Sequence, residues 1–294
     1  MWRKSLTCAT FFGLDIHRME SDNEENFLRE FGMAVLSLMT DFGLKDGNVG
    51  VMKGVIWGIA PGAQISDLSH LIAPQNVAEA ALILFRAAPY FPAGTIHIVV
   101  VDPGVGTARR AMAAQIGEQF YVGPDNGTIS LWLEKSPAAR FVALDKPEYW
   151  LPQISHVFHG RDIFAPAAAH LAAGVPLEAL GSPFSDPVLL HLPQPQPTSG
   201  GLRGEVIHID HFGNITSNIR AEALGARLQT PQKLRVRLNG VEIDGLVQTF
   251  GERPAGSLVA LIGSTGNLLA CLVNGSAAAR LNSKIGDIFE VFFE

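Results

Sequence analysis

Residues 95–102 read Thr-Ile-His-Ile-Val-Val-Val-Asp, and this stretch decides the fold. Its apolar, largely β-branched side chains lack the polar alternation of a half-exposed strand, so we expect a strand that is buried on both faces. A helical repeat over 76–88 precedes it, and a strand-like run over 112–116 follows it. Strands that alternate with helices predict a three-layer α/β domain with a mostly parallel sheet.

The same alternation fills the first part of the chain. Asn76, three residues before Glu79, is typical of a capping box at the start of a helix. Pro61-Gly62 ends the helical repeat that comes before it. The remaining elements expected here are strands over 34–39, 63–66 and 141–144 and helices over 49–59 and 163–173.

The pattern changes after residue 191. Residues 192–201 combine alternating prolines with a glycine pair, which predicts a semi-extended linker. Beyond the linker the helical period fades, and Asn239-Gly240 between two apolar runs is a strong hairpin signal. We therefore expect an N-terminal α/β domain over 33–191 and a C-terminal antiparallel β-barrel domain over 202–294. The strands expected in the barrel are 204–209, 233–238, 241–243, 257–262, 268–273 and 287–293.

Composition limits the class of protein. With 47% hydrophobic and 17% charged residues, the chain can fill a core, which excludes a disordered protein. A net charge of −6 argues against a nucleic-acid partner. No apolar run approaches the roughly eighteen residues that span a bilayer, so no membrane partner is expected. The two cysteines, Cys8 and Cys271, provide no disulfide framework and favour a cytoplasmic location. Residues 1–32 are interpreted as a flexible leader or a misassigned start.

Polar residues follow two of the predicted buried strands, where α/β enzymes place their sites. Asp41 and Asp46 bracket a glycine turn after the first strand, and a carboxylate there can accept hydrogen bonds from a ribose diol. The alternative is that each aspartate only caps a turn or the next helix. Asp102 ends the central strand, and Arg109 across a glycine-rich turn is its natural partner. That pair could also be purely structural.

Four further clusters join glycine with polar residues. His159 precedes a glycine at the start of a predicted helix, where it could face a cleft, although a lone histidine is more often structural. Asn214, four residues after Asp210, could read a purine edge or be an ordinary turn residue, and Ser264 lies in another glycine turn. The run 123–127, Gly-Pro-Asp-Asn-Gly, is interpreted as a structural turn. No His-Glu-x-x-His or Cys-x-x-Cys spacing occurs, so no metal site is predicted.

Six motifs occur in a fixed order along the chain. Together they resemble the S-adenosylmethionine hydroxide adenosyltransferases, which are adenosine-forming hydrolases related to bacterial fluorinase and chlorinase. The resemblance covers residue 34 to near the C-terminus and leaves 1–32 outside. The motifs are Thr-Asp-Phe-Gly with Asp-Gly over 40–47, Met-Lys-Gly over 52–54, Val-Asp-Pro-Gly-Val-Gly-Thr over 101–107, Gly-Pro-Asp-Asn-Gly over 123–127, Phe-His-Gly-Arg-Asp over 158–162 and Asp-x-Phe-Gly-Asn over 210–214.

The resemblance implies an activity and an assembly. The family hydrolyses S-adenosylmethionine to adenosine and methionine, with attack of water or hydroxide on the ribose 5′ carbon, and no cofactor is implied. The resemblance also implies a homotrimer whose active sites lie between subunits. It assigns the family's catalytic triad to Asp102, Arg109 and His159. By the same resemblance the substrate contacts fall on Asp41 for the ribose, Asp46 for the methionine side, Asn214 for adenine, and Asp210 and Ser264 for the methionine end.

Three other functions are alternatives to hydrolysis. A non-catalytic adenosine or S-adenosylmethionine binding module would not need the three triad residues together. A halide-using adenosyl transferase of the same superfamily has a neutral residue where Asp102 stands. A metal-dependent nucleotide hydrolase would need a metal site. One segment departs from the family pattern: Asn267 follows Gly266 where the family usually has an aromatic residue.

Overall fold

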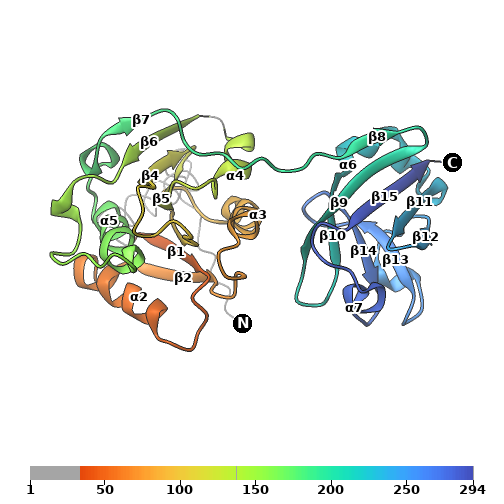
Figure 1. Ribbon diagram of the computed structural model, residues 1–294, viewed down its shortest axis with the longest axis horizontal. Helices are drawn as coiled ribbons and strands as arrows, with labels where there is room; N and C mark the ends of the chain where they lie inside the picture. The colour runs from red at the N-terminus through yellow and green to blue at the C-terminus, as the bar shows by residue number, and fades with distance from the viewer. Residues whose placement is uncertain (1–33, 137, 294) are drawn as a thin grey trace, which may run out of the picture. The chain divides into compact units, whose positions relative to one another are not determined.

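The computed structural model describes residues 34–136 and 138–293, so the predicted leader, 1–32, lies outside the described residues. The chain divides into two compact units, Met1–Leu190 and His191–Glu294. Each unit has its own sheet and its own hydrophobic core (Figure 1).

The N-terminal unit is built on a seven-stranded sheet with the strand order β2-β1-β3-β5-β4-β6-β7. Its first four strands pair in parallel, and the other three continue the sheet in antiparallel pairing. The predicted mostly parallel α/β sheet is confirmed, with an antiparallel part that the sequence pattern did not indicate. The strands are β1 (Val35–Thr40), β2 (Gln64–Ser69), β3 (Ile96–Val100), β4 (Ala111–Ile116), β5 (Gln119–Pro124), β6 (Ala139–Ala143) and β7 (Pro183–Phe184).

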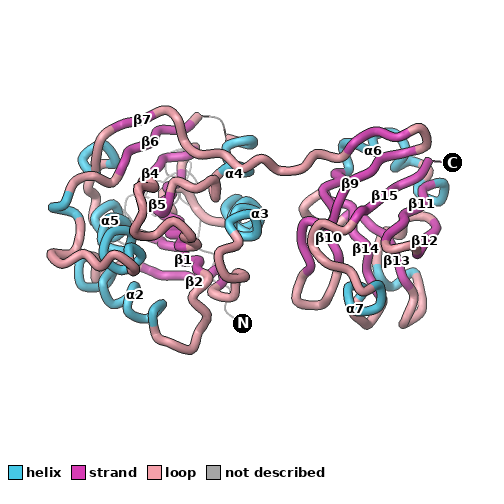
Figure 2. The backbone as a smooth tube through the Cα atoms, viewed as in Figure 1, coloured by secondary structure: helices cyan, strands magenta, loops and turns pink. Residues whose placement is uncertain are grey.

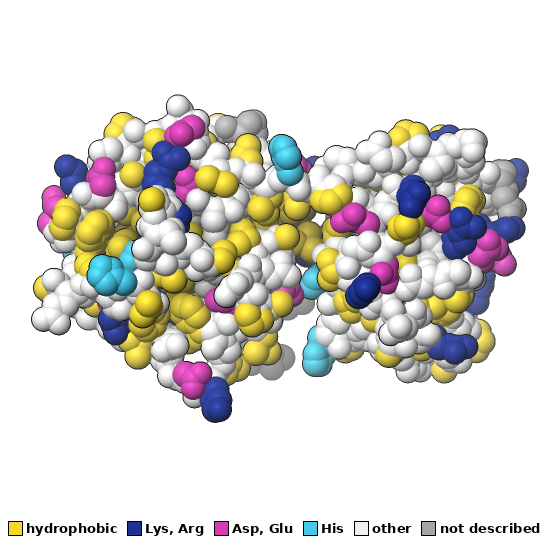
Figure 3. Space-filling view, in the orientation of Figure 1, with side chains coloured by type: hydrophobic (Ala, Val, Ile, Leu, Met, Phe, Trp, Pro, Cys, Tyr) yellow, Lys and Arg dark blue, Asp and Glu magenta, His cyan; other side chains and the backbone are white. Residues whose placement is uncertain are grey.

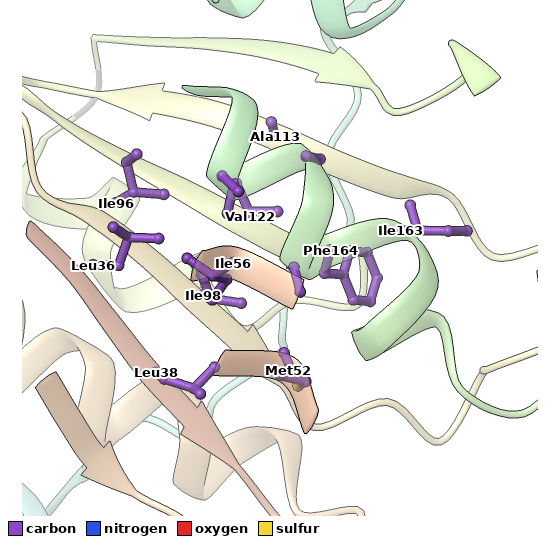
Figure 4. Packing of buried hydrophobic residues seen from close by; sticks show 14 of the residues in the cluster. Leu36, Leu38, Met52, Ile56, Ile96, Ile98, Ala113, Val122, Ile163 and Phe164 are labelled. Atoms are coloured by element: carbon purple, nitrogen blue, oxygen red, sulfur yellow. The ribbon is translucent and has the colours of Figure 1, made fainter. Parts of the chain in front are cut away.

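Helices cover both faces of this sheet and make it a three-layer unit. α2 (Asn48–Ile59) and α5 (Ala165–Ala172) share one core with the sheet. α3 (Val77–Ala87) and α4 (Ser130–Lys135) share a second core with its opposite face. Figure 4 shows the first core, where side chains of β1 and β3 such as Leu38 and Ile98 meet Met52 and Ile56 of α2 and Phe164. The central strand is thus buried on both faces, as its composition predicts.

Two helix starts differ from their sequence signals. Asn76 caps α3 by accepting a hydrogen bond from the Glu79 backbone N–H at 3.0 Å. The Glu79 carboxylate, however, accepts from the Ala73 backbone N–H at 2.9 Å, so only half of the predicted capping box forms. The helix expected over 163–173 begins earlier, as a π-helical turn over Gly160–Phe164 that continues into α5.

The C-terminal unit is an eight-stranded antiparallel sheet in which β8 pairs with β9 outside the main order β12-β11-β15-β9-β10-β14-β13. A bridge between Leu246 and Ala260 joins its two edges, so the sheet is nearly a barrel (Figure 2). Part of the segment predicted as a linker, 192–201, belongs to this sheet. The strands are β8 (Gln196–Thr198), β9 (Gly201–Ile209), β10 (Ile215–Arg220), β11 (Leu234–Leu238), β12 (Val241–Asp244), β13 (Leu258–Ile262), β14 (Asn267–Leu272) and β15 (Ile288–Phe293), and the helices are α6 (Ala221–Leu224) and α7 (Ala277–Leu281).

Several short 3-10 helices connect the strands and helices of both units. No helix among the described residues is both long and apolar enough to cross a membrane. On the face shown in Figure 3, the Lys and Arg side chains of the described residues are scattered among acidic ones. The 3-10 helices are Ala88–Tyr90, Pro147–Tyr149, Leu177–Leu180, Gly225–Gln229, Pro231–Lys233 and Phe250–Glu252.

Candidate active site

Two predicted site residues leave neighbouring strands at the same edge of the sheet. β1 and β3 pair in parallel, with Thr40 opposite Val100. Asp41 follows β1 directly, and Asp102 comes two residues after the end of β3. Because neighbouring strands are about 4.8 Å apart, the two carboxylates start from adjacent points of the backbone. This is the edge where open α/β sheets bind their ligands.

Asp102 and Arg109 form a nearly buried ion pair. The Arg109 Nε donates to Asp102 Oδ1 at 2.9 Å and to Oδ2 at 3.0 Å, and Nη2 also donates to Oδ2. The two side chains are 5% and 11% exposed. Gly106, between them, has φ +75° and lies so close to the next loop that a Cβ would come within 2.3 Å of the His156 carbonyl oxygen. The turn that returns Arg109 to Asp102 therefore requires glycine at this position.

His159 completes a bonded group of three side chains. The Arg109 Nη2 lies 3.1 Å from His159 Nδ1. Since a guanidinium can only donate, Nδ1 accepts and the proton of the neutral ring is on Nε2. The pKa of His159 is lowered below its usual value, mainly by burial and to a smaller extent by the positive charge of Arg109. The negative charges of Asp102 and Asp162 act in the opposite direction but are outweighed. The ring is therefore neutral at neutral pH.

Aromatic and polar contacts fix the loop that carries His159. The Phe158 ring meets the Phe42 ring edge-on at 5.7 Å, which ties this loop to the turn that follows Asp41. The carboxylate of Asp162 is fully buried and accepts from the Ser155 backbone N–H at 2.7 Å. The structure thus brings the Asp41 turn and the Asp102–Arg109–His159 group to one region of the N-terminal unit.

Asp41 and Asp46 occupy different environments. Asp41 is half-buried, and its Oδ2 accepts from the Gln75 backbone N–H at 2.7 Å. Asp46 is exposed in the turn that precedes α2. The cap of α2 is Gly47, with φ 73°, so neither aspartate caps this helix. The alternative reading of the two aspartates as helix caps does not apply here.

The predicted site residues of the C-terminal unit fall into two places. Asn214 donates to Asp210 twice, from its backbone N to Oδ1 and from Nδ2 to Oδ2, both at 2.8 Å. Ser264 is exposed in the turn between β13 and β14. This turn lies at the Arg220 end of β10, where Ala221 N donates to Gly266 O, whereas Asn214 precedes the other end. Within the unit, Ser264 is not brought to the other two residues.

The turn over 123–127, interpreted as structural, touches the site. Asn126 Nδ2 donates to the Val101 carbonyl at 2.9 Å and so holds the strand end that carries Asp102. The amide is oriented by Thr128, whose hydroxyl donates to Asn126 Oδ1 at 2.8 Å. Arg110, next to Arg109, donates to the buried Asp125 at 2.9 Å. The signal for this role was an Asp-Asn pair flanked by glycines, but its hydrogen-bond partners were not readable from the sequence.

The described residues hold no group of three His, Cys, Asp or Glu side chains that could bind a metal ion. The triad contains only one carboxylate and one imidazole, and Arg109 lies between them. A cation would have to displace the guanidinium to use both groups. The geometry instead suits an anionic or polarised oxygen beside Arg109.

Comparison with known proteins identifies related sequences over most of the chain. The sequence model of the SAM hydroxide adenosyltransferase N-terminal domain matches residues 36–181, and that of the corresponding C-terminal domain matches 204–290. An (R)-S-adenosyl-L-methionine hydrolase of Thermus thermophilus is 43% identical, with 86% of this chain and 98% of that protein covered. One of the same name from Methanocaldococcus jannaschii is 31% identical, with 91% and 99% covered.

A more distant relative and a solved structure also match most of the chain. A protein named fluorinase from an Actinoplanes species is 30% identical, with 87% of this chain and 96% of that protein covered. A crystal structure of an uncharacterized conserved protein from Thermotoga maritima superposes with a TM-score of 0.82 at 36% identity, covering 87% of this chain and 99% of that one. The matches therefore span both units.

Proposed function

The chain belongs to the SAM hydroxide adenosyltransferase family, and from this membership we propose that it hydrolyses S-adenosyl-L-methionine to adenosine and L-methionine. The observation that carries the proposal is the bonded group Asp102–Arg109–His159 at the strand edge. Relatives named (R)-S-adenosyl-L-methionine hydrolase, identical at 43% and 42% of the aligned positions, support it.

The reaction does not require a general acid from the protein. Water attacks the 5′ carbon of the ribose, the bond between this carbon and the sulfonium sulfur breaks, and its electron pair returns to sulfur. Methionine leaves as a neutral thioether and needs no proton, while the attacking water loses one proton to solvent. The requirement is an oriented water with partial hydroxide character, in line with the breaking bond.

Each triad residue has a role that follows from its contacts. The positive charge of Arg109 stabilises negative charge that develops on the attacking oxygen. The Asp102 carboxylate has lone pairs beyond those taken by Arg109 and can accept a hydrogen bond from the water. His159 has Nδ1 occupied by Arg109, so its protonated Nε2 is the nitrogen that can orient the oxygen.

We further propose the substrate contacts and the assembly that the family resemblance implies. Asp41 binds the ribose diol, Asp46 the methionine side, and Asn214, Asp210 and Ser264 the adenine and methionine ends. The enzyme is a homotrimer in which the C-terminal unit of one chain completes the pocket of another. It needs no cofactor and works in the cytoplasm, which the low cysteine content favours.

Hydrolysis in oxygen-18 water tests the reaction. The label should appear in the 5′ hydroxyl of adenosine and be absent from methionine, because the carbon–sulfur bond breaks and sulfur gains no oxygen. Turnover should persist in the presence of a chelator. Unlabelled adenosine, or no adenosine at all, would overturn the proposal.

Light scattering combined with activity measurements tests the assembly. A homotrimer should have three times the 31.5 kDa mass of one chain. Activity per chain should fall on dilution below the dissociation concentration of the trimer. A particle of one chain mass that remains fully active would contradict the shared active site.

A further inference from the structure

A second chain of hydrogen-bonded side chains lies directly behind the Asp41 turn. The Thr40 hydroxyl and His70 Nδ1 are 2.9 Å apart, and His70 Nε2 and Asp67 Oδ1 are also 2.9 Å apart. Lys53 Nζ donates to the second oxygen of Asp67 at 2.7 Å. Thr40 and His70 are buried, whereas the Asp67 side chain is 44% exposed. The network therefore runs from the surface to the residue that precedes Asp41.

The protons of this network have one consistent arrangement. Thr40 Oγ1 accepts from the Phe42 backbone N–H at 3.2 Å, so its own proton can point to His70 Nδ1. The imidazole proton is then on Nε2 and points to the Asp67 carboxylate. Burial alone would raise the pKa of Asp67, but hydrogen bonds from Lys53 and His70 outweigh it and the pKa is lowered. An ionised Asp67 thus fixes the tautomer and the orientation of His70.

The same segment of chain holds the other atoms of the Asp41 turn. The His70 carbonyl accepts from the Gly43 N–H at 2.8 Å, and the Gln75 N–H donates to the Asp41 carboxylate. Gln75 has φ 65°, a left-handed conformation that non-glycine residues rarely adopt. Both ends of the turn and its carboxylate are therefore set by contacts with residues 67–75.

The order Asp67–His70–Thr40 has the form of a nucleophilic triad, but it cannot act as one. The Thr40 side chain is 0% exposed, and its hydroxyl is engaged with both His70 and Phe42. No substrate carbon can approach this oxygen. What the network can do is hold the backbone that presents Asp41.

We propose that Thr40, His70 and Asp67 are positioning residues that orient Asp41 for recognition of the ribose diol. This inference rests on the proposed function, in which Asp41 binds that diol. None of the three touches the reacting atoms. Their loss should therefore weaken ribose recognition more than it slows the chemical step.

The test compares three threonine variants of the full chain. Thr40→Val keeps the shape and removes the hydroxyl, whereas Thr40→Ser retains a hydroxyl. Thr95→Val is the matched control, because Thr95 is 1% exposed and its hydroxyl has no hydrogen-bond partner among the described residues. Calorimetry measures the affinities for adenosine and 2′,3′-dideoxyadenosine, and steady-state kinetics with S-adenosylmethionine give KM and kcat.

The expected results separate positioning from stability. In Thr40→Val the preference for adenosine over the dideoxy compound should fall about tenfold, the scale of one hydrogen bond to a charged group. Its KM should rise about as much, with kcat within about threefold of wild type. Thr40→Ser should restore both values, and Thr95→Val should leave them unchanged. His70→Asn, whose amide can still reach Thr40, should retain more of the preference than His70→Gln.

Two results would overturn the inference. The first is a Thr40→Val protein with lowered thermal stability but a wild-type preference for adenosine, which would make the network structural only. The second is a wild-type protein that binds both nucleosides equally. A wild-type protein that binds adenosine with the expected preference but releases none from S-adenosylmethionine would instead refute the proposed function.

Discussion

The substitution Asp102→Asn removes the one negative charge that pairs with Arg109, at one end of the triad, and little else. Asparagine has the shape of aspartate and keeps one oxygen, but it places an NH₂ group where Arg109 now donates. Arg109 is 11% exposed, so its charge would remain buried without a counterion. We therefore expect losses of both stability and turnover.

The magnitudes follow from these contacts. Removing one partner of a buried ion pair typically costs about 3–5 kcal/mol. Arg109 would keep its hydrogen bond to His159 and its place 5.1 Å from the centre of the Phe164 ring, so the lower end, about 3 kcal/mol, is expected for the N-terminal unit. If Asp102 accepts a hydrogen bond from the attacking water, as we propose, its loss should reduce kcat by about 10²–10⁴-fold. The affinity for adenosine should change little, since Asp102 binds no recognition group.

Adenosine release gives kcat, and tryptophan fluorescence in urea gives the free energy of unfolding. Trp57, Trp132 and Trp150 all lie in the described part of the N-terminal unit, so fluorescence reports on the unit that holds the triad. The matched control is Asp186→Asn, since Asp186 pairs with the neighbouring Arg110 but is 80% exposed. The control should behave as wild type. An Asp102→Asn protein with kcat within threefold of wild type would refute the assigned role.

Three other predictions concern pH, the turn and the nucleophile. Burial lowers the pKa of His97 from 6.5 to about 4, so the unfolded chain takes up the proton at a higher pH than the folded one. The free energy of unfolding should therefore fall by ~3 kcal/mol between pH 6.5 and 4, and urea titrations of His97→Asn should show a smaller loss. Gly106→Ala adds a Cβ at a left-handed position against His156, so a thermal melt should show a transition lower by several degrees, with reduced turnover. High chloride should leave adenosine as the main product on chromatography, because a halide, unlike water, cannot donate a hydrogen bond to the Asp102 carboxylate.

Elements with strong local signals could be predicted from the sequence, and elements defined by their neighbours could not. β3 follows from an unbroken apolar run, and α3 from its repeat and the cap at Asn76. β5 contains Gly123 and Pro124 and is a strand because it pairs with β3 on one side and β4 on the other. β10, with the polar sequence Ile-Thr-Ser-Asn-Ile-Arg, is likewise defined by β9 and β14. Strand preference depends strongly on such context.

In the candidate site, too, residues with a local sequence signal could be predicted and residues defined by distant contacts could not. The Asp102–Arg109 pair could be inferred because a carboxylate at the end of a buried strand needs a partner, and Arg109 is only seven residues away. His159 is fifty residues from Arg109, and its place in the site came from the family resemblance rather than from any local pattern. Asn126 and His70 were missed because their roles depend on the particular carbonyl and hydroxyl that they meet in the fold.

Asp41 and Asp102 leave adjacent strands of one sheet edge, yet their surroundings suit them to different tasks. Asp102 is 5% exposed and receives three hydrogen bonds from a guanidinium, so its charge is compensated and its position fixed. Asp41 is half-buried and receives one backbone hydrogen bond, from Gln75, which leaves lone pairs for the hydroxyls of a ligand. Asp102 is held by Arg109 and, through the Val101 carbonyl, by Asn126. The Asp41 turn is held by Thr40 and His70, and these two sets of residues do not overlap. The roles proposed for the two aspartates, ligand recognition and activation of water, therefore depend on different hydrogen bonds. The Phe42–Phe158 ring contact nevertheless joins the two loops, so mutations in the two networks are expected to be only partly additive.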